Sequence, residues 1–191
     1  RGLGDVYKRQ LPIELQTTKN IFALMFLLRG IPFVDLAYLR KADIQGNTLK
    51  YRRRKTGRLL TVMLTPDAIK LIRIVAKTKP ESPYLFPFLS SPEGTEAAYH
   101  EYQSSLRMFN YRLSRLKKYM KTAAHLSSYT IRHTWATMAY YCEIHPGIIS
   151  EAMGHSSIKV TETYLKPFQN EKIDNANSQV ISYVKEYASI V

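Results

Sequence analysis

The stretch that decides the fold is residues 127–165, SSYTIRHTWATMAYYCEIHPGIISEAMGHSSIKVTETYL. It places Arg132 beside His133, and a second histidine, His155, ahead of Tyr164. An arginine can hold a phosphate through two parallel hydrogen bonds, imidazoles can hold or move protons, and a phenol can act as a nucleophile. Phosphodiester transfer without a metal needs groups of these kinds, and the rest of the chain has to show whether they act together.

The composition favours a polyanionic partner. The 191 residues include 28 Lys and Arg against 15 Asp and Glu, a net charge of +13. Such a basic fold is typical of nucleic-acid-binding proteins, although a solvated basic surface without a partner would carry the same charge. The single cysteine, Cys142, excludes an internal disulfide and a cysteine-based zinc site, and favours the reducing cytoplasm. No apolar run approaches the roughly 18 residues of a membrane span.

The chain is long enough for one domain with a buried core. Residues 1–10, RGLGDVYKRQ, fit no element that follows and resemble translated adapter sequence at the end of a gene fragment. We therefore expect a non-native leader at residues 1–10 and one domain over residues 11–191.

The pattern of apolar residues predicts a mostly helical α+β fold with one small antiparallel sheet. Two strands, at residues 48–54 and 58–64, flank a turn at residues 55–57, and residues 43–45 add a short first strand. The proline-rich residues 79–94 are expected to form a loop. Helices are expected at residues 17–29, 32–39, 65–77, 95–121, 130–142, 146–153, 157–165 and 170–188.

In its motifs the chain resembles the catalytic domain of tyrosine recombinases, the phage integrase family. The matching motifs are KTG at residues 55–57, RHTWAT at 132–137, GHSS at 154–157, and a tyrosine nine positions after His155. The resemblance runs from residue 17 to about residue 170 and implies that family's catalytic fold. Within it, FLLRGIPFVDLAYLRKADIQGN looks most like integrases of Bacteroidetes mobile elements.

The resemblance assigns a role to five residues. Tyr164 would attack the scissile phosphate, form a 3′-phosphotyrosyl bond and release a 5′-hydroxyl. Arg132 would grip a non-bridging oxygen, and His155 would hydrogen-bond the same phosphate. His133 would be an accessory acid or base, and Lys55 at the hairpin tip would protonate the leaving oxygen. The family uses no metal or other cofactor.

Four arginines, Arg52, Arg53, Arg54 and Arg58, surround the predicted hairpin turn. They alternate across two strands, so at least half of them are expected to face DNA and bind phosphates, which sets position rather than sequence preference. The alternative is that they are exposed charges that protect a strand edge from aggregation.

Two positions depart from the family pattern. The first catalytic arginine normally lies two residues after a glycine, where this chain has Pro32 after Gly30. Arg29 lies about one helical turn earlier and is the candidate substitute, although it can equally be a charge at a helix C-terminus. Tyr129 stands where the family usually has a histidine, and its hydroxyl can donate a hydrogen bond but cannot carry positive charge.

The C-terminal residues 170–191 carry an apolar stripe at Ile173, Val180, Ile181, Val184 and Tyr187. In the family the last helix packs into a neighbouring protomer, so the resemblance implies a homotetramer on double-stranded DNA. Packing on its own domain would use the same stripe. The family's N-terminal core-binding domain is not expected within this chain.

We expect a site-specific DNA recombinase that acts on DNA in the bacterial cytoplasm, associated with the nucleoid. One alternative is a catalytically impaired, DNA-binding homologue, because Pro32 replaces the usual arginine. Others are a relaxing enzyme similar to type IB topoisomerases, and a basic nucleic-acid-binding module without catalysis.

Overall fold

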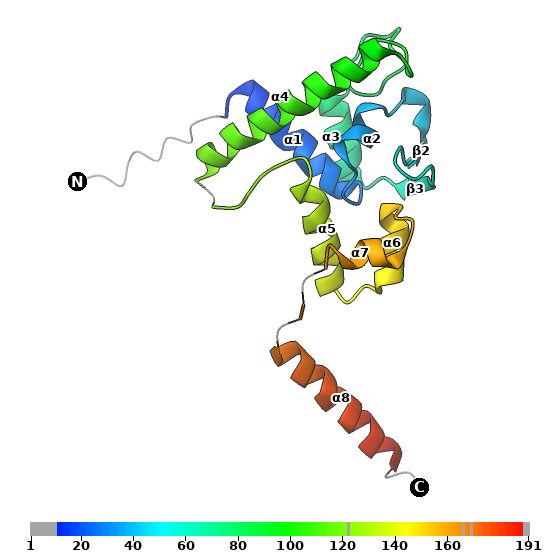
Figure 1. The fold of residues 1–191 in the computed structure, drawn as a ribbon, viewed down its shortest axis with the longest axis vertical. Helices are drawn as coiled ribbons and strands as arrows, with labels where there is room; N and C mark the ends of the chain where they lie inside the picture. Colours follow the sequence, from blue (N-terminus) through cyan, green and yellow to red (C-terminus); the bar gives the residue numbers. More distant parts are fainter. Residues whose placement is uncertain (1–10, 122, 166, 169, 189–191) are drawn as a thin grey trace, which may run out of the picture.

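Helices form most of the chain, and one small sheet lies at the side of the helical body (Figure 1). This computed structural model describes residues 11–121, 123–165, 167–168 and 170–188, so the expected leader at residues 1–10 lies outside the described residues. In chain order the elements are α1 (Ile13–Leu27), α2 (Phe33–Ala37), a 3-10 turn η1 (Lys41–Asp43), β1 (Ile44–Gln45), β2 (Thr48–Arg52), β3 (Leu59–Met63), α3 (Pro66–Val75), α4 (Glu96–Met120), α5 (Thr130–Tyr141), α6 (Pro146–Met153), α7 (Ile158–Glu162) and α8 (Asn170–Ala188). The predicted fold class is confirmed.

The sheet is antiparallel in the order β1-β2-β3, with Tyr51 paired with Leu60 and Arg52 with Leu59. Alternate residues of β2 and β3 are buried, because successive side chains of a strand point to opposite faces. The inward face of β2 carries Leu49 and Tyr51, which join the main core with residues of α1 to α4. The same alternation continues past the end of β2 to Arg53, which is also buried.

Helix α1 begins and ends earlier than expected. Thr17 and Thr18, at the expected start, lie inside the helix, where their hydroxyls donate to the carbonyls of Ile13 and Glu14 at 2.9 and 2.8 Å. The helix ends at Leu27 because Arg29 and Gly30 both adopt left-handed backbone, with φ of 61° and 66°. The chain therefore turns sharply just before Ile31.

The proline-rich loop between α3 and α4 is confirmed, and it covers part of the main core. Tyr84, Leu85, Phe86 and Leu89 of this loop are buried. Residue Thr95 then caps α4, accepting a hydrogen bond from the backbone N–H of Ala98 at 3.2 Å.

A second, smaller core lies between α5 and α6. It consists of Ala136, Ala139, Ile149 and Met153, with Tyr164 packed against it. Helix α7 was expected over residues 157–165 but spans Ile158–Glu162. As a result, Tyr164 lies in the turn that follows the helix rather than on it.

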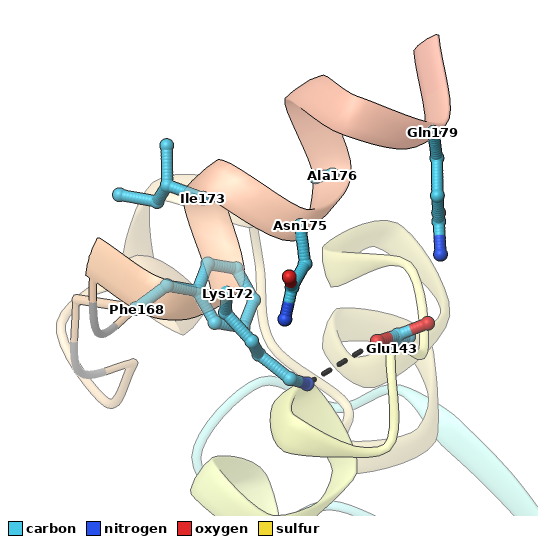
Figure 2. A pocket seen from close by; sticks show the side chains of 7 residues that line it. All are labelled: Glu143, Phe168, Lys172, Ile173, Asn175, Ala176 and Gln179. Atoms are coloured by element: carbon cyan, nitrogen blue, oxygen red, sulfur yellow. Dashed lines mark hydrogen bonds and ion pairs between the residues drawn. The ribbon is translucent and has the colours of Figure 1, made fainter. Parts of the chain in front are cut away.

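Helix α8 projects away from the rest of the molecule (Figure 1). Its first turn is anchored, since Lys172 Nζ lies 3.1 Å from the Tyr141 carbonyl and 3.2 Å from the Glu143 carboxylate (Figure 2). Further along, Ile173, Val180, Ile181 and Val184 are exposed, while the side chain of Tyr187 lies outside the described residues. None of the described helices is both long and apolar enough to cross a membrane.

Candidate active site

Hydrogen bonds fix the backbone of Tyr164, while its hydroxyl lies at the exposed end of the ring. Its N–H donates to the Thr161 carbonyl at 2.9 Å, and its carbonyl accepts from the Thr137 hydroxyl at 3.0 Å. These bonds tie the turn after α7 to the side of α5. The half-buried ring rests on the small core, so the phenol is presented from a held position.

Three other rings surround the Tyr164 phenol. Its hydroxyl lies 2.8 Å from the Tyr129 hydroxyl, within hydrogen-bonding distance. Its ring centroid lies 4.3 Å from that of His133 and 5.1 Å from that of His155. The Tyr129 hydrogen bond to Tyr164, followed by burial, raises the pKa of Tyr129. Tyr129 therefore stays protonated and can donate to the Tyr164 oxygen.

Arg132 is buried beneath this cluster, with 3% of its surface exposed. Its two terminal nitrogens donate to the carbonyls of Gly30 and Met153, at 3.0 and 2.6 Å. Its Nε is also buried and has no hydrogen-bond partner. Burial, and next the charge of Arg53, lower the pKa of Arg132, but a guanidinium remains charged. The two carbonyls thus hold the terminal nitrogens and leave the Nε–H without a partner.

Gly30 permits this close approach. A Cβ atom there would lie 3.0 Å from the Arg132 Cα and 3.2 Å from the Trp135 Cβ. We expect Gly30→Ala to destabilise the fold by about 1–3 kcal/mol more than the left-handed backbone alone requires. Urea denaturation of Gly46→Ala supplies that baseline, because Gly46 also has positive φ (58°) and no atom within 4 Å of the added carbon. Equal losses in the two variants would contradict the close approach.

His155 is held as a neutral ring. It is 4% exposed, and its Nδ1 lies 2.8 Å from the Thr161 hydroxyl. Burial, with the charges of Arg132, Arg53 and Lys55, lowers the pKa of His155 to about 4. In the tautomer whose Nδ1 accepts from the Thr161 hydroxyl, the ring proton is on Nε2, which is buried and unpartnered. That tautomer can donate to a phosphate oxygen.

This depressed pKa predicts a loss of stability in acid. An unfolded histidine takes up a proton below pH 6.5, whereas folded His155 resists until about pH 4. The free energy of unfolding should therefore fall as the pH is lowered through this window, by about 3 kcal/mol. Denaturation midpoints at several pH values should show a shallower fall in His155→Gln. Replacing the exposed His125 with Gln should leave the slope unchanged, and equal slopes in all three proteins would refute this origin.

The hairpin between β2 and β3 docks against the loop that holds His155. Thr56 Oγ1 donates to the Gly154 carbonyl at 3.0 Å, and Arg58 donates to the His155 carbonyl at 2.5 Å. The exposed Lys55 directly precedes Thr56 in the same turn, and its charge acts on His155. The sequence-predicted Tyr164, Arg132, His133, His155 and Tyr129 are thus gathered in one cluster, with Lys55 at its edge. In the described part of the chain, no group of three or more His, Cys, Asp or Glu side chains is placed to hold a metal ion.

The profile of the phage integrase family matches residues 12–171, most of the chain. The chain belongs to the phage integrase family. The solved structures similar to this one share its fold. No curated protein sequence matches the chain significantly.

Three solved structures illustrate the likeness in fold. XerA recombinase has 16% identity and a TM-score of 0.58, over 86% of this chain and 63% of its own. Tn1549 transposon integrase in complex with circular intermediate DNA has 16% identity and a TM-score of 0.62, over 89% and 60%. XerH site-specific recombinase bound to its palindromic difH substrate has 16% identity and a TM-score of 0.62, over 88% and 47%. This chain therefore spans less than two thirds of each protein.

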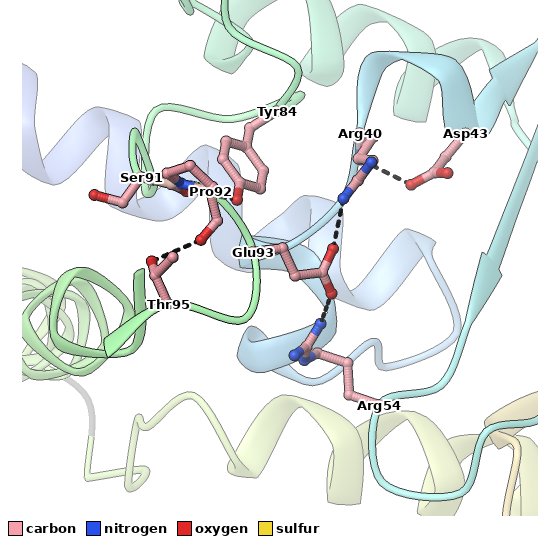
Figure 3. Close-up of polar contacts among 8 residues, drawn as sticks. All are labelled: Arg40, Asp43, Arg54, Tyr84, Ser91, Pro92, Glu93 and Thr95. Carbon is pink, nitrogen blue, oxygen red and sulfur yellow. Dashed lines mark hydrogen bonds and ion pairs between the residues drawn. The ribbon is translucent and has the colours of Figure 1, made fainter. Parts of the chain in front are cut away.

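The hairpin arginines of this integrase-family chain do not form one exposed row. Arg52 donates across the hairpin to the Gly57 carbonyl at 3.1 Å. Arg54 pairs with Glu93 at 2.5 Å and covers the Tyr38 ring at 3.7 Å, and Arg40 binds the other oxygen of the same carboxylate (Figure 3). Arg53 is 7% exposed and points into the protein. Arg52, Arg54 and Arg58 are thus exposed to solvent. Arg53 is instead buried and pairs with Asp35.

The two positions considered for the family's first arginine flank Gly30 and Ile31, and Gly30 contacts Arg132. Pro32 forms the start of α2 with φ of −67° and offers no polar group. Arg29 is half-buried in the turn after α1, and its charge acts on the buried Tyr51 phenol. The charges that lower the pKa of His155 come from Arg132, Arg53 and Lys55. Sequence reasoning overlooked Asp35, the buried carboxylate that binds Arg53 at 2.8 Å.

Proposed function

We propose that this chain is the catalytic part of a site-specific recombinase that cuts and rejoins double-stranded DNA through a covalent 3′-phosphotyrosine at Tyr164. The observation that carries the proposal is the cluster itself. A fixed tyrosine lies against two imidazoles whose pKa values burial lowers, above a buried arginine with a free donor. The net charge of +13 suits DNA as the partner.

In the proposed reaction the Tyr164 oxygen attacks the scissile phosphorus while the bond to the 5′-oxygen breaks. His133 lies against the Tyr164 ring, and its lowered pKa leaves it neutral at pH 7, so it can accept the phenolic proton. Arg132 and His155 stabilise the charge that grows on the non-bridging oxygens. Lys55, on the docked hairpin, gives a proton to the departing oxygen. Religation reverses these steps, because the phosphotyrosyl ester conserves the energy of the broken bond.

The DNA contacts and the assembly form part of the same proposal. Arg52, Arg54 and Arg58 are exposed around the hairpin and would bind the DNA backbone. The exposed stripe of α8, formed by Ile173, Val180, Ile181 and Val184, would pack against a neighbouring protomer, giving a tetramer on two duplexes. Lambda integrase has been solved as a dimer bound to a core site, which supports a multimeric assembly on DNA. The likeness of residues 26–47 to mobile-element integrases suggests that the DNA is the end of such an element.

Covalent capture from a pool of duplexes tests the proposal and finds the target sequence in the same experiment. The chain is incubated with nicked duplexes that carry a randomised segment, so that cleavage releases a short strand and traps the covalent product. Denaturing gels should reveal a protein–DNA band, peptide mapping should place the DNA on Tyr164, and sequencing of the attached strands should yield one preferred site. Binding without a covalent band would instead favour the impaired homologue that Pro32 makes a second candidate.

A further inference from the structure

Three buried nitrogens, on two arginines and one histidine of the candidate site, have no hydrogen-bond partner. In the described part of the chain, the buried side-chain nitrogens and oxygens without a partner are Arg53 Nε, Arg132 Nε and His155 Nε2. Buried polar groups normally have hydrogen-bond partners, so each of these unpartnered nitrogens needs an explanation. Since Arg53 also lowers the pKa values of Arg132 and His155, the three groups belong to one electrostatic cluster.

The charge balance of this cluster favours an anion. Arg53 and Arg132 are both buried, at 7% and 3% exposure, and Asp35 is the buried carboxylate beside them. Asp35 binds Arg53 at 2.8 Å and also accepts the backbone N–H of Arg54 at 3.0 Å. One guanidinium is therefore left without a carboxylate, and a buried charge is costly unless a ligand of opposite charge compensates it.

Both the backbone and the end of the Arg53 side chain are held in place, while Nε between them is free. The backbone N–H of Arg53 donates to the Arg58 carbonyl at 2.8 Å, and the backbone carbonyl of Arg53 accepts from the Gly57 N–H at 2.7 Å. At the far end one terminal nitrogen is held by Asp35. This arrangement matches that of Arg132, whose terminal nitrogens are held by carbonyls while Nε stays free. Both side chains are thus fixed before a ligand arrives, as catalytic stabilisation requires.

We propose that Arg53 supplies the catalytic guanidinium missing at Pro32, binding the scissile phosphate through Nε together with Arg132 and His155. This inference rests on the proposed function, since it assigns a residue to the same phosphate. The arginine has moved from the start of α2 to the end of β2, and Asp35 at the inner face of α2 keeps it in place. Arg29, by contrast, is half-buried in a turn with left-handed backbone, and among the described residues it is not one of the buried groups left without a partner.

Neutralising the phosphate tests the role of Arg53 separately from any role in folding. At the mapped cleavage site, a methylphosphonate replaces one charged non-bridging oxygen with a methyl group, so charge compensation is no longer needed. We expect Arg53→Met to slow covalent capture of natural DNA by at least about a hundredfold. The ratio of the methylphosphonate rate to the natural rate should rise at least about tenfold over that of the unaltered chain. The ratio should not change in Arg40→Met, which loses only a surface ion pair with Glu93.

An unchanged ratio in Arg53→Met would overturn the proposal, because a purely structural residue slows both substrates alike. A raised ratio in Arg29→Ala instead would assign the missing arginine to Arg29. If Arg53→Met does not fold, the double variant Asp35→Asn/Arg53→Met removes both charges and keeps an acceptor for the Arg54 N–H. The ratio of its methylphosphonate rate to its natural-DNA rate then tests the proposal in the same way.

A second measurement does not depend on cleavage. Buried arginine Nε–H groups give separate proton–nitrogen NMR signals, which can be followed while inorganic phosphate is added to the chain. The signals of Arg53 and Arg132 should shift together, with one dissociation constant. A shift of Arg132 alone, or of neither, would overturn the inference. If both shift but no covalent product ever forms on DNA, the phosphate pocket stands and the proposed recombinase function falls.

Discussion

Tyr164→Phe is expected to form no covalent product with DNA, whereas Tyr129→Phe should still form it. The two hydroxyls lie only 2.8 Å apart, so geometry alone does not decide which one attacks. Tyr129 is the hydrogen-bond partner, and its raised pKa keeps it protonated as a donor to the Tyr164 oxygen. Losing one such bond costs about 1 kcal/mol, which corresponds to about a fivefold slower reaction.

The two variants are matched, because each removes one hydroxyl from the same pair. Covalent product is measured on the captured duplex by denaturing gel, and binding of the same duplex is measured beside it by gel shift. Both variants should bind as the unaltered chain does. A product that persists in Tyr164→Phe and vanishes in Tyr129→Phe would make Tyr129 the nucleophile. Loss of product in both would mean that the pair acts as one unit.

Local patterns predicted most of the fold correctly. The helix α6 matched its expected bounds, since Pro146 opens it and Gly154, with φ of 66°, ends it. The hairpin and the short first strand were also correct, because alternation and turn residues act over a few positions. The errors came where side chains made unforeseen bonds. Thr17 and Thr18, where α1 was expected to begin, bond back to the preceding turn of a helix that starts at Ile13, and Tyr164 lies just beyond α7.

The residues of the candidate site that belong to sequence motifs were predictable. The resemblance named Tyr164, Arg132 and His155, and the structure gathers them, but their roles remain predictions. Alternation across the two strands predicted that at least half of the four hairpin arginines face DNA, without indicating which. The alternation of β2 indicated that Arg53 is buried, because Arg53 directly follows this strand and lies two and four residues after the inward-facing Tyr51 and Leu49. Its partner, Asp35, was not predictable in this way, because their contact joins residues that a local pattern does not connect.

Asp35→Asn is expected to destabilise the fold by about 3–5 kcal/mol, because it leaves the Arg53 charge buried without a partner. The Asp35 side chain is fully buried and that of Arg53 is 8% exposed, so water cannot replace the lost carboxylate charge. An asparagine oxygen still accepts the Arg54 N–H, so the change isolates the charge. Urea denaturation measures the loss, and the exposed Asp67→Asn should change stability by no more than about 0.5 kcal/mol. A loss in Asp35→Asn as small as that control would mean that Arg53 finds another partner.

The double variant Asp35→Asn/Arg53→Met separates the stability of this pair from its chemistry. A buried ion pair replaced as a whole is often neutral, because its two charges had to be desolvated in the first place. We therefore expect the double variant to regain most of the stability that Asp35→Asn loses, since no buried charge is left stranded. Covalent capture should nevertheless stay at the low level of Arg53→Met, because the guanidinium needed by the phosphate is gone. Recovery of both stability and cleavage would reduce Arg53 to a partner for Asp35. Recovery of stability alone would mean that the chain keeps a costly buried pair for the sake of the reaction.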